Sequence, residues 1–318
     1  MGFFDFLTKW FHKKKKEETI VESRSEDKPN NEESLSIEAT EEDSSKSWQD
    51  DAGVTYNLDG SKLLKGNWNG SSSNVYEIKS GTKSICDKAF YSCSSPKKLI
   101  LPNSLRNIGE EVFAYSGLEE VVSNSANFVA EDGGLYYKKE GKLSLIYYFG
   151  NQTSVTIPER VFAIRSWAFE GRDEIKKVIL PYNLSSLAEG TFQRCGNLES
   201  ITLPDSIKTI RYATFRDCTS LKEIVLPDEV QSIEDFAFQG CESLCRISLG
   251  ENVKHIGRSA FYECKSLSAI EMPDNIDFIG ENAFLGCTSL VLYVSAGKLS
   301  YFQKLLKGQS DSVRIVER

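Results

Sequence analysis

The sequence predicts a repeat solenoid, in which short strands stack from coil to coil and pair into a parallel sheet. Three observations support this fold class. A Phe recurs every 23 residues from Phe169 to Phe284, and Phe90 and Phe113 have the same spacing. A Cys follows most of these residues three positions later. A Pro closes an aliphatic L-x-x-I-x-L segment twelve positions after most of them.

Each unit combines one strand with one short turn. The L-x-x-I-x-L segment is aliphatic and alternates at its centre, which indicates a strand, and Pro ends it because it cannot donate to a ladder. The stretch around the Phe, such as EDFAFQGC, predicts a helical or 3₁₀ turn on the opposite side. The chain is therefore expected to be an α/β-type solenoid with internal columns of Phe, Leu and Ile.

The period also divides the chain into segments. Residues 1–16 form a basic amphipathic segment, residues 17–51 a disordered acidic linker and residues 52–318 the solenoid. Within the solenoid we expect an N-terminal cap at 52–85, repeats at about 86–122 and 155–292, a hairpin insertion at 123–154 and a C-terminal cap at 293–318. Terminal units are atypical in such arrays because they cover the ends of the core.

Hairpins are predicted where the period fails. In the N-terminal cap, an Asp59-Gly60 turn separates two apolar runs. In the insertion, two tyrosine-rich runs are separated by a turn at Lys139–Lys142, which predicts a second hairpin. Tyr136 and Tyr147 could form a binding surface, since Tyr is frequent at binding hot spots. They could equally pack against neighbouring coils, which we favour.

The C-terminal cap is predicted as a helix followed by a strand. Leu299, Phe302, Leu305 and Leu306 lie on one side of the expected helix, and SVRIVER reads as the strand.

Charge is distributed unevenly along the chain. Residues 1–16 hold five lysines and one acid, and residues 17–50 hold twelve acids and three bases, so the repeats are nearly neutral against a total of -8. Nucleic acid is not expected as a partner because phosphate binding needs a basic stripe. The acidic stretch has few apolar residues, which predicts a disordered tether.

The N-terminal segment has aromatic residues at helical spacing ahead of a lysine run. An interfacial helix on an anionic membrane is one interpretation, and a frayed terminus or a helix docked on a protein partner are the others. No secretory signal or membrane-spanning stretch is recognisable. The candidate membrane contacts are Phe3, Phe6, Leu7, Trp10, Phe11, Lys13, Lys14, Lys15 and Lys16.

The cysteines and acids do not indicate catalysis or metal binding. Six of the eight cysteines occupy the repeat column, where buried free thiols are expected, rather than metal-ligand or disulfide spacing. His255 falls in a repeat turn where a solvated side chain is ordinary. No phosphate loop or nucleophile motif is recognised, so no cofactor and no enzymatic activity are predicted.

The units AFQGCESLCRISLGENVKHIG and AFYECKSLSAIEMPDNIDFIG resemble the BspA-like class of leucine-rich repeats over roughly residues 52–317. The departures are Pro96, Ser116, Gly250 and Ser295. The resemblance implies a non-enzymatic solenoid for protein–protein recognition, and many members of that class are surface or secreted adhesins.

Outward strand positions lie eight and ten residues after each Phe, shifted by one residue after Phe113. Their mixture of β-branched residues and charges suits a protein ligand, although β-branched residues also occupy unused sheet faces. We expect a protein-binding module or scaffold in the cytoplasm, peripheral to the inner membrane face. The alternative is an exported cell-surface adhesin. The candidate binding residues are Lys98, Ile100, Glu120, Val122, Lys177, Ile179, Thr202, Glu223, Val225, Arg246 and Glu271, with Tyr136 and Tyr147.

Overall fold

A computed structural model describes residues 36–66, 74–306 and 313–318. These residues belong to one compact unit, Leu35–Arg318. The predictions made for residues 1–16 and for residues 17–35 lie outside the described ranges.

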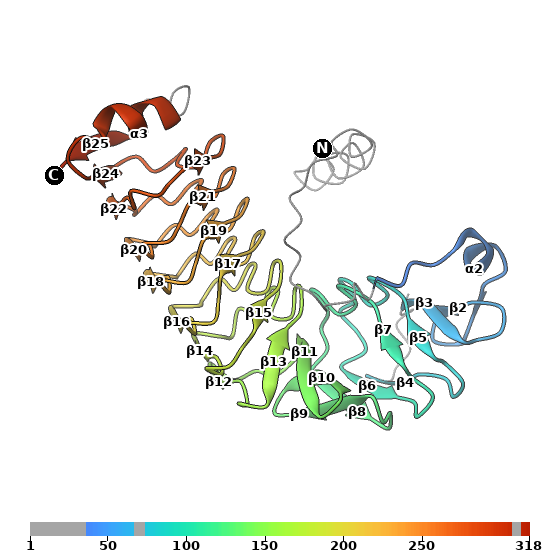
Figure 1. Cartoon of the computed structure of the whole chain (residues 1–318). Coiled ribbons are helices and arrows are strands. Elements are labelled where there is room, and N and C mark those ends of the chain that lie inside the picture. Colours follow the sequence, from blue (N-terminus) through green and yellow to red (C-terminus); the bar gives the residue numbers. More distant parts are fainter. Residues whose placement is uncertain (1–35, 67–73, 307–312) are drawn as a thin grey trace. The chain divides into compact units, whose positions relative to one another are not determined.

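The L-x-x-I-x-L segments form the predicted parallel strands, here called the first ladder (Figure 1). Among the described residues, the strands of this ladder form four short sheets, and paired strands are in register, as Ile224 pairs with Ile247. The strands are β4 (Val75–Glu77), β6 (Lys98–Leu101), β8 (Glu120–Ser123), β12 (Ser154–Thr156), β14 (Lys177–Ile179), β16 (Ser200–Thr202), β18 (Glu223–Val225), β20 (Arg246–Ser248), β22 (Ala269–Glu271), β24 (Val291–Val294) and β25 (Arg314–Glu317).

A second parallel ladder runs through the Ile that lies eighteen residues after each Phe. Sequence analysis predicted one strand per unit and missed this one, because two-residue strands are too short to show a period. Its members are β3 (Lys62–Gly66), β5 (Ser84–Ile85), β7 (Asn107–Ile108), β13 (Val161–Ile164), β15 (Ser186–Leu187), β17 (Thr209–Ile210), β19 (Ser232–Ile233), β21 (His255–Ile256) and β23 (Phe278–Ile279).

The predicted turns around the Phe have hydrogen bonds of the 3₁₀ type, such as that from the Gln239 amide to the Phe236 carbonyl at 3.1 Å, but they do not form helices. The residues two before and two after each Phe adopt left-handed backbone angles, as Phe236 (φ 61°) and Gly240 (φ 73°) do around Phe238. A left-handed residue stops a right-handed helix. The amide of Phe238 instead donates to the carbonyl of Ala260 in the next coil at 2.8 Å. The turn side is therefore also hydrogen-bonded from coil to coil.

The predicted Phe column is buried and continuous within each part of the array. Successive rings stack at centroid distances between 5.0 Å for Phe169–Phe192 and 5.9 Å for Phe90–Phe113. The cysteine column behaves as predicted: all eight cysteines are free thiols. The Cys241 Sγ donates to the Phe215 carbonyl at 3.1 Å, a contact that recurs along the column. The thiols thus satisfy backbone carbonyls between coils.

The insertion forms the predicted hairpin, with one strand more than expected. β9 (Phe128–Glu131), β10 (Gly134–Lys139) and β11 (Lys142–Tyr148) pair antiparallel, and β11 also pairs in parallel with β13. Its side chains alternate between two buried clusters. Tyr147 packs 5.6 Å from Phe113 in the N-terminal cluster, whereas Tyr148 stacks 5.1 Å from Phe169 in the C-terminal one. The insertion therefore joins two stacks of coils.

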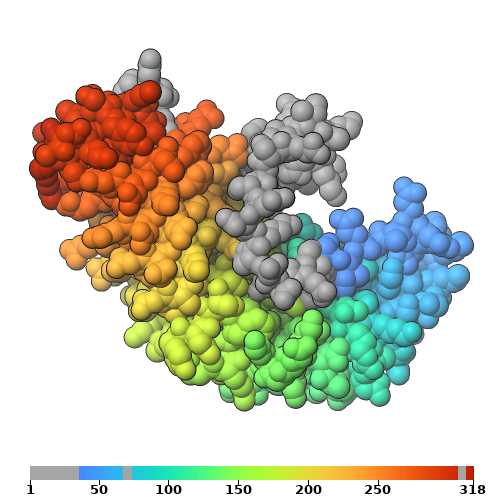
Figure 2. All heavy atoms as spheres, in the orientation of Figure 1, coloured from blue at the N-terminus to red at the C-terminus, as the bar shows by residue number. Residues whose placement is uncertain are grey.

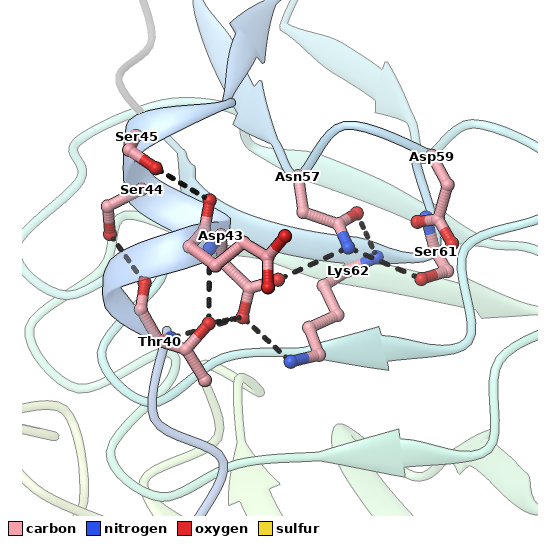
Figure 3. Close-up of polar contacts among 9 residues, drawn as sticks. Thr40, Asp43, Ser44, Ser45, Asn57, Asp59, Ser61 and Lys62 are labelled. Carbon is pink, nitrogen blue, oxygen red and sulfur yellow. Dashed lines mark hydrogen bonds and ion pairs between the residues drawn. The ribbon is translucent and has the colours of Figure 1, made fainter.

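Residues 36–51 are ordered, which corrects the prediction of a disordered linker up to residue 51. They contain α2 (Glu41–Ser45) and β1 (Trp48–Gln49), and β1 pairs with β2 (Val54–Tyr56) of the predicted cap hairpin. The acids that suggested disorder are hydrogen-bond acceptors here. Asp43 closes a capping box with Thr40 and accepts from Lys62 Nζ at 2.7 Å (Figure 3). The N-terminal cap thus begins earlier than the sequence indicated.

The C-terminal cap agrees with the prediction. Phe302 of α3 (Leu299–Leu305) is fully buried, and Leu305 and Leu306 pack beside it. β25 pairs in parallel with β24. In the space-filling view the coils follow one another in chain order up to this cap (Figure 2).

Three departures from the repeat have structural consequences. Pro96 and Ser116 replace the usual Leu and Cys, and both line a small apolar cavity beside Phe90 and Phe113. Gly250 replaces Pro because a Cβ there would lie 2.6 Å from the Pro227 carbonyl oxygen. Neighbouring coils approach too closely at that point for a side chain.

Candidate functional site

The outward side chains of the first ladder form the strand face, which contains eleven of the thirteen predicted binding residues. Every three-residue strand of this ladder has a buried centre and exposed ends. Ile179 is 44% exposed and Val225 is 69% exposed, whereas Ile100 and Val122 are half-buried. The alternation that the sequence predicted is therefore present in the fold.

Tyr136 and Tyr147 do not belong to this surface, which corrects their selection as binding residues. They are 1% and 2% exposed. Tyr136 belongs to the C-terminal core cluster and Tyr147 to the N-terminal one, so the packing alternative is confirmed. Arg172 covers Tyr147, with its guanidinium 4.8 Å from the ring centroid.

One side of the strand face, where the strands begin, has charges of both signs that pair between coils. Lys98 contacts Glu120 at 2.7 Å, and Arg246 contacts Glu223 at 3.6 Å. Both pairs are exposed, and such pairs typically contribute less than about 1 kcal/mol. Because these charges pair with one another, this side of the strand face has little net charge.

The opposite side of the strand face, after the strand-ending Pro, differs in composition. Tyr182 is 77% exposed there, beside an exposed Ile179. In the following coils the equivalent loop positions are acidic and exposed, and we call them the acidic edge: Asp205, Asp228, Glu229, Glu251 and Asp274. Sequence analysis treated these acids as ordinary loop residues. The usable signal was their recurrence directly after the strand in four consecutive units.

A buried acid with a raised pKa lies away from the strand face. Glu170 is 4% exposed, and its Oε1 accepts hydrogen bonds from Tyr115 Oη and from Gln193 Nε2 at 3.0 Å. Burial raises the pKa of its carboxyl to about 7, and the Tyr115 hydrogen bond partly offsets this rise. Its Oε1 is occupied by two donors, so the carboxyl serves to link the coils of Phe113 and Phe169.

The remaining side chains that could take part in chemistry, His255 and the cysteines, have structural roles. His255 stacks on Phe278 with ring centroids 4.5 Å apart. Burial raises the pKa of the Cys218 and Cys241 thiols well above their usual value, which disfavours the reactive thiolate. In the described ranges, no three His, Cys, Asp or Glu side chains converge as metal ligands.

The sequence of the repeats identifies the family. The model of the BspA type leucine rich repeat region, in six copies, matches residues 65–137, 144–235 and 208–306. The chain belongs to this family. The match spans both core clusters and most of the coils of the solenoid.

Several solved structures share the fold. A leucine-rich repeat protein of Eubacterium ventriosum is 26% identical with a TM-score of 0.57, over 66% of this chain and 64% of that one. The pneumococcal vaccine antigen PcpA is 24% identical with a TM-score of 0.63, over 77% and 64%. A leucine rich cell surface protein of Faecalibacterium prausnitzii is 23% identical with a TM-score of 0.56, over 76% and 62%. No curated protein matches the chain.

The chain thus spans under two thirds of the length of each of these three proteins. The candidate membrane contacts at Phe3–Phe11 and Lys13–Lys16 lie outside the described residues. Within the described ranges, neither helix is long and apolar enough to cross a membrane.

Proposed function

We propose that this chain is a non-enzymatic protein-binding module that recognises its partner through the strand face. The observation that carries the proposal is the exposure of Ile179 and Val225 at equivalent positions of β14 and β18. Apolar side chains at the centre of a face with a charged rim are the usual composition of protein interfaces. Membership of a leucine-rich repeat family supports the same function.

The proposal is tested with matched variants of the full-length chain. Ile179→Lys with Val225→Lys places two charges at the centre of the strand face and removes no buried contact. Leu58→Lys is the control, because Leu58 is 68% exposed but lies in the turn of the cap hairpin. Proteins captured from extracts are quantified, and the strongest candidate is purified for a direct affinity measurement.

We expect the double variant to lower affinity for the purified partner at least tenfold, with Leu58→Lys unchanged. Equal affinities for all three proteins would rule out the strand face as the binding surface. Circular dichroism and thermal unfolding establish that each variant is folded.

For location, we propose the cell surface, the alternative to a cytoplasmic scaffold. The leucine rich cell surface protein of Faecalibacterium prausnitzii, which shares this fold, supports this location. The aromatic and basic residues 1–16 support membrane contact on either side of a membrane. Surface labelling of intact cells distinguishes the two locations. Membrane fractionation after substitution of Trp10 and Phe11 by Ala tests the membrane contact separately.

A further inference from the structure

The acidic edge of the strand face has little counter-charge within the described part of the chain: Lys298 Nζ approaches it but donates to the Asp274 backbone carbonyl at 3.4 Å. Lysines and arginines pair with acids on the side where the strands begin, as Lys98 does with Glu120, and at the strand ends Arg318 pairs with Glu271 of β22. None of the five carboxylates of the acidic edge takes part in an ion pair among the described residues. The two sides of one sheet face are therefore treated differently by the sequence.

Hydrogen bonds hold the loops of this edge in register. Asn252 Nδ2 donates to the Asp228 carbonyl at 3.0 Å, and Asn275 Nδ2 donates to the Glu251 carbonyl at 3.2 Å. The acids thus repeat at the spacing of the coils, about 4.8 Å. Like charges at neighbouring positions of a sheet repel one another. A cationic partner would relieve that repulsion.

Exposed apolar side chains lie beside the acids. Ile179, Tyr182 and Val225 are all more than two fifths exposed, and Thr202 lies between the coils of Ile179 and Val225. A ligand that covers this patch and also reaches the acidic edge needs an apolar stripe next to a cationic one. This combination selects a polypeptide rather than a small cation.

The spacing of the acids selects the conformation of that polypeptide. From Asp205 to Asp274 there are three coil intervals, or about 14 Å. Three turns of α-helix rise about 16 Å, so one cation per turn stays within reach of one acid per coil. In an extended segment, four side chains on the same side span about 20 Å, so they do not match the spacing of the acids.

We propose that the strand face from Ile179 to Asp274 binds a basic amphipathic α-helix that lies along the coil axis. Its apolar stripe covers Ile179, Tyr182 and Val225, and its lysines or arginines lie along the acidic edge. This proposal rests on the proposed function of the strand face and specifies the chemistry of the partner.

The test uses the full-length chain and two synthetic peptides of sixteen residues with the same Lys, Leu and Ala composition. One peptide places Lys and Leu on adjacent helical stripes, and the other alternates them with a period of two. The acidic-edge variant carries Asp205→Asn, Asp228→Asn, Glu251→Gln and Asp274→Asn. The control variant carries Glu140→Gln, Glu174→Gln, Glu189→Gln and Glu281→Gln, four exposed acids outside the strand face.

We expect the helical peptide to bind at least tenfold more tightly than the alternating one, with a salt-dependent affinity. The acidic-edge variant should lose at least tenfold and the control less than twofold. Equal loss in both variants, or equal binding of both peptides, would overturn the proposal. So would self-association that the acidic-edge variant abolishes, since a second copy would then be the occupant.

The outcome is separable from that of the proposed function. If the Ile179→Lys, Val225→Lys variant loses affinity for the protein partner but the wild type does not bind the helical peptide, the strand face remains the binding surface and the helix proposal is wrong. If the variant keeps its affinity for the partner and the wild type does not bind the peptide, both proposals are wrong.

Discussion

The two stacks of coils reach the same packing by different means. In the C-terminal stack, each Phe from Phe169 to Phe284 stacks on the next, and each coil repeats the same hydrogen bonds. In the N-terminal stack, the column starts at Phe90 and ends on Tyr147 of the inserted hairpin. A column position can therefore be filled from a strand as well as from a repeat turn, provided that a ring reaches it.

The largest effect is expected in the regular stack. Phe238 is fully buried between Phe215 and Phe261, at 5.4 and 5.3 Å. Phe238→Ala should lower the free energy of unfolding by about 3–5 kcal/mol, measured by urea denaturation. Val225→Ala on the exposed face should stay within about 0.5 kcal/mol. A Phe238→Ala protein as stable as the wild type would mean that the column does not bear on stability.

The next effect concerns Glu170, at the contact between the stacks. Its pKa is raised from 4.5 to about 7, so the folded state holds the proton more tightly than the unfolded state. Stability should therefore fall as pH rises from about 4.5 to 7. Glu170→Gln keeps an oxygen for both donors and should be more stable than the wild type at pH 8, by on the order of 2 kcal/mol.

The two proteins should be equally stable near pH 4, where the carboxyl is protonated in both states. Thermal unfolding from pH 4 to 8 measures the difference. A pH-independent difference between them would show that the effect is one of packing rather than of ionisation.

A smaller effect is expected in the N-terminal cap. The hydrogen bond from Lys62 and those from Thr40 hold the pKa of Asp43 well below its usual 3.8. This depressed pKa stabilises the cap above about pH 4, and the contribution is lost as the pH falls further. Asp43→Asn should cost about 1 kcal/mol at pH 7, as the loss of a helix cap does.

Thermal unfolding at pH 7 and at pH 3 measures this cost. Glu41→Gln, on the same exposed helix, is the matched control. A cost that is unchanged at pH 3 would show that the carboxylate charge is not involved.

The smallest effect concerns the cavity where the N-terminal stack departs from the repeat. Ser116 stands in the cysteine column and lines the cavity with Pro96. Ser116→Cys restores the larger, less polar side chain and should stabilise the protein by up to about 1 kcal/mol. Urea denaturation checks it, and destabilisation would mean that the 3.4 Å contact between Ser116 Oγ and Tyr147 Oη matters more than the cavity.

The sequence predicts the regular stack well because a period of 23 residues repeats the same environment. Equivalent Phe, Leu, Ile and Cys positions in successive units therefore have the same burial. The outward-facing residues between them can be predicted from the same spacing. The left-handed residues at Trp167 and Phe236 could not be predicted, since bulky residues disfavour that conformation and only the coil-to-coil hydrogen bonds impose it.

Outside the repeats, the composition of residues 36–51 led to a wrong prediction, and the pattern of the insertion was ambiguous. Residues 36–51 looked like a linker because acids such as Asp43 and Asp50 count as solubilising. Each instead accepts hydrogen bonds from the first coils. The tyrosines of the insertion fitted a surface or a core equally well. The acidic edge is visible in the sequence as a recurring position, but the lack of ion pairs to its carboxylates among the described residues can be established only from the three-dimensional structure.

The claim that Tyr147 of the insertion completes the N-terminal column is tested most directly by hydrogen exchange of the full-length Tyr147→Ala protein. We expect amides of β5 and β7 to exchange faster than in the wild type, because the N-terminal stack loses the ring that ends its column. Amides of β19 and β21 should keep their protection. Equal loss of protection in both stacks, or no loss in either, would contradict the account.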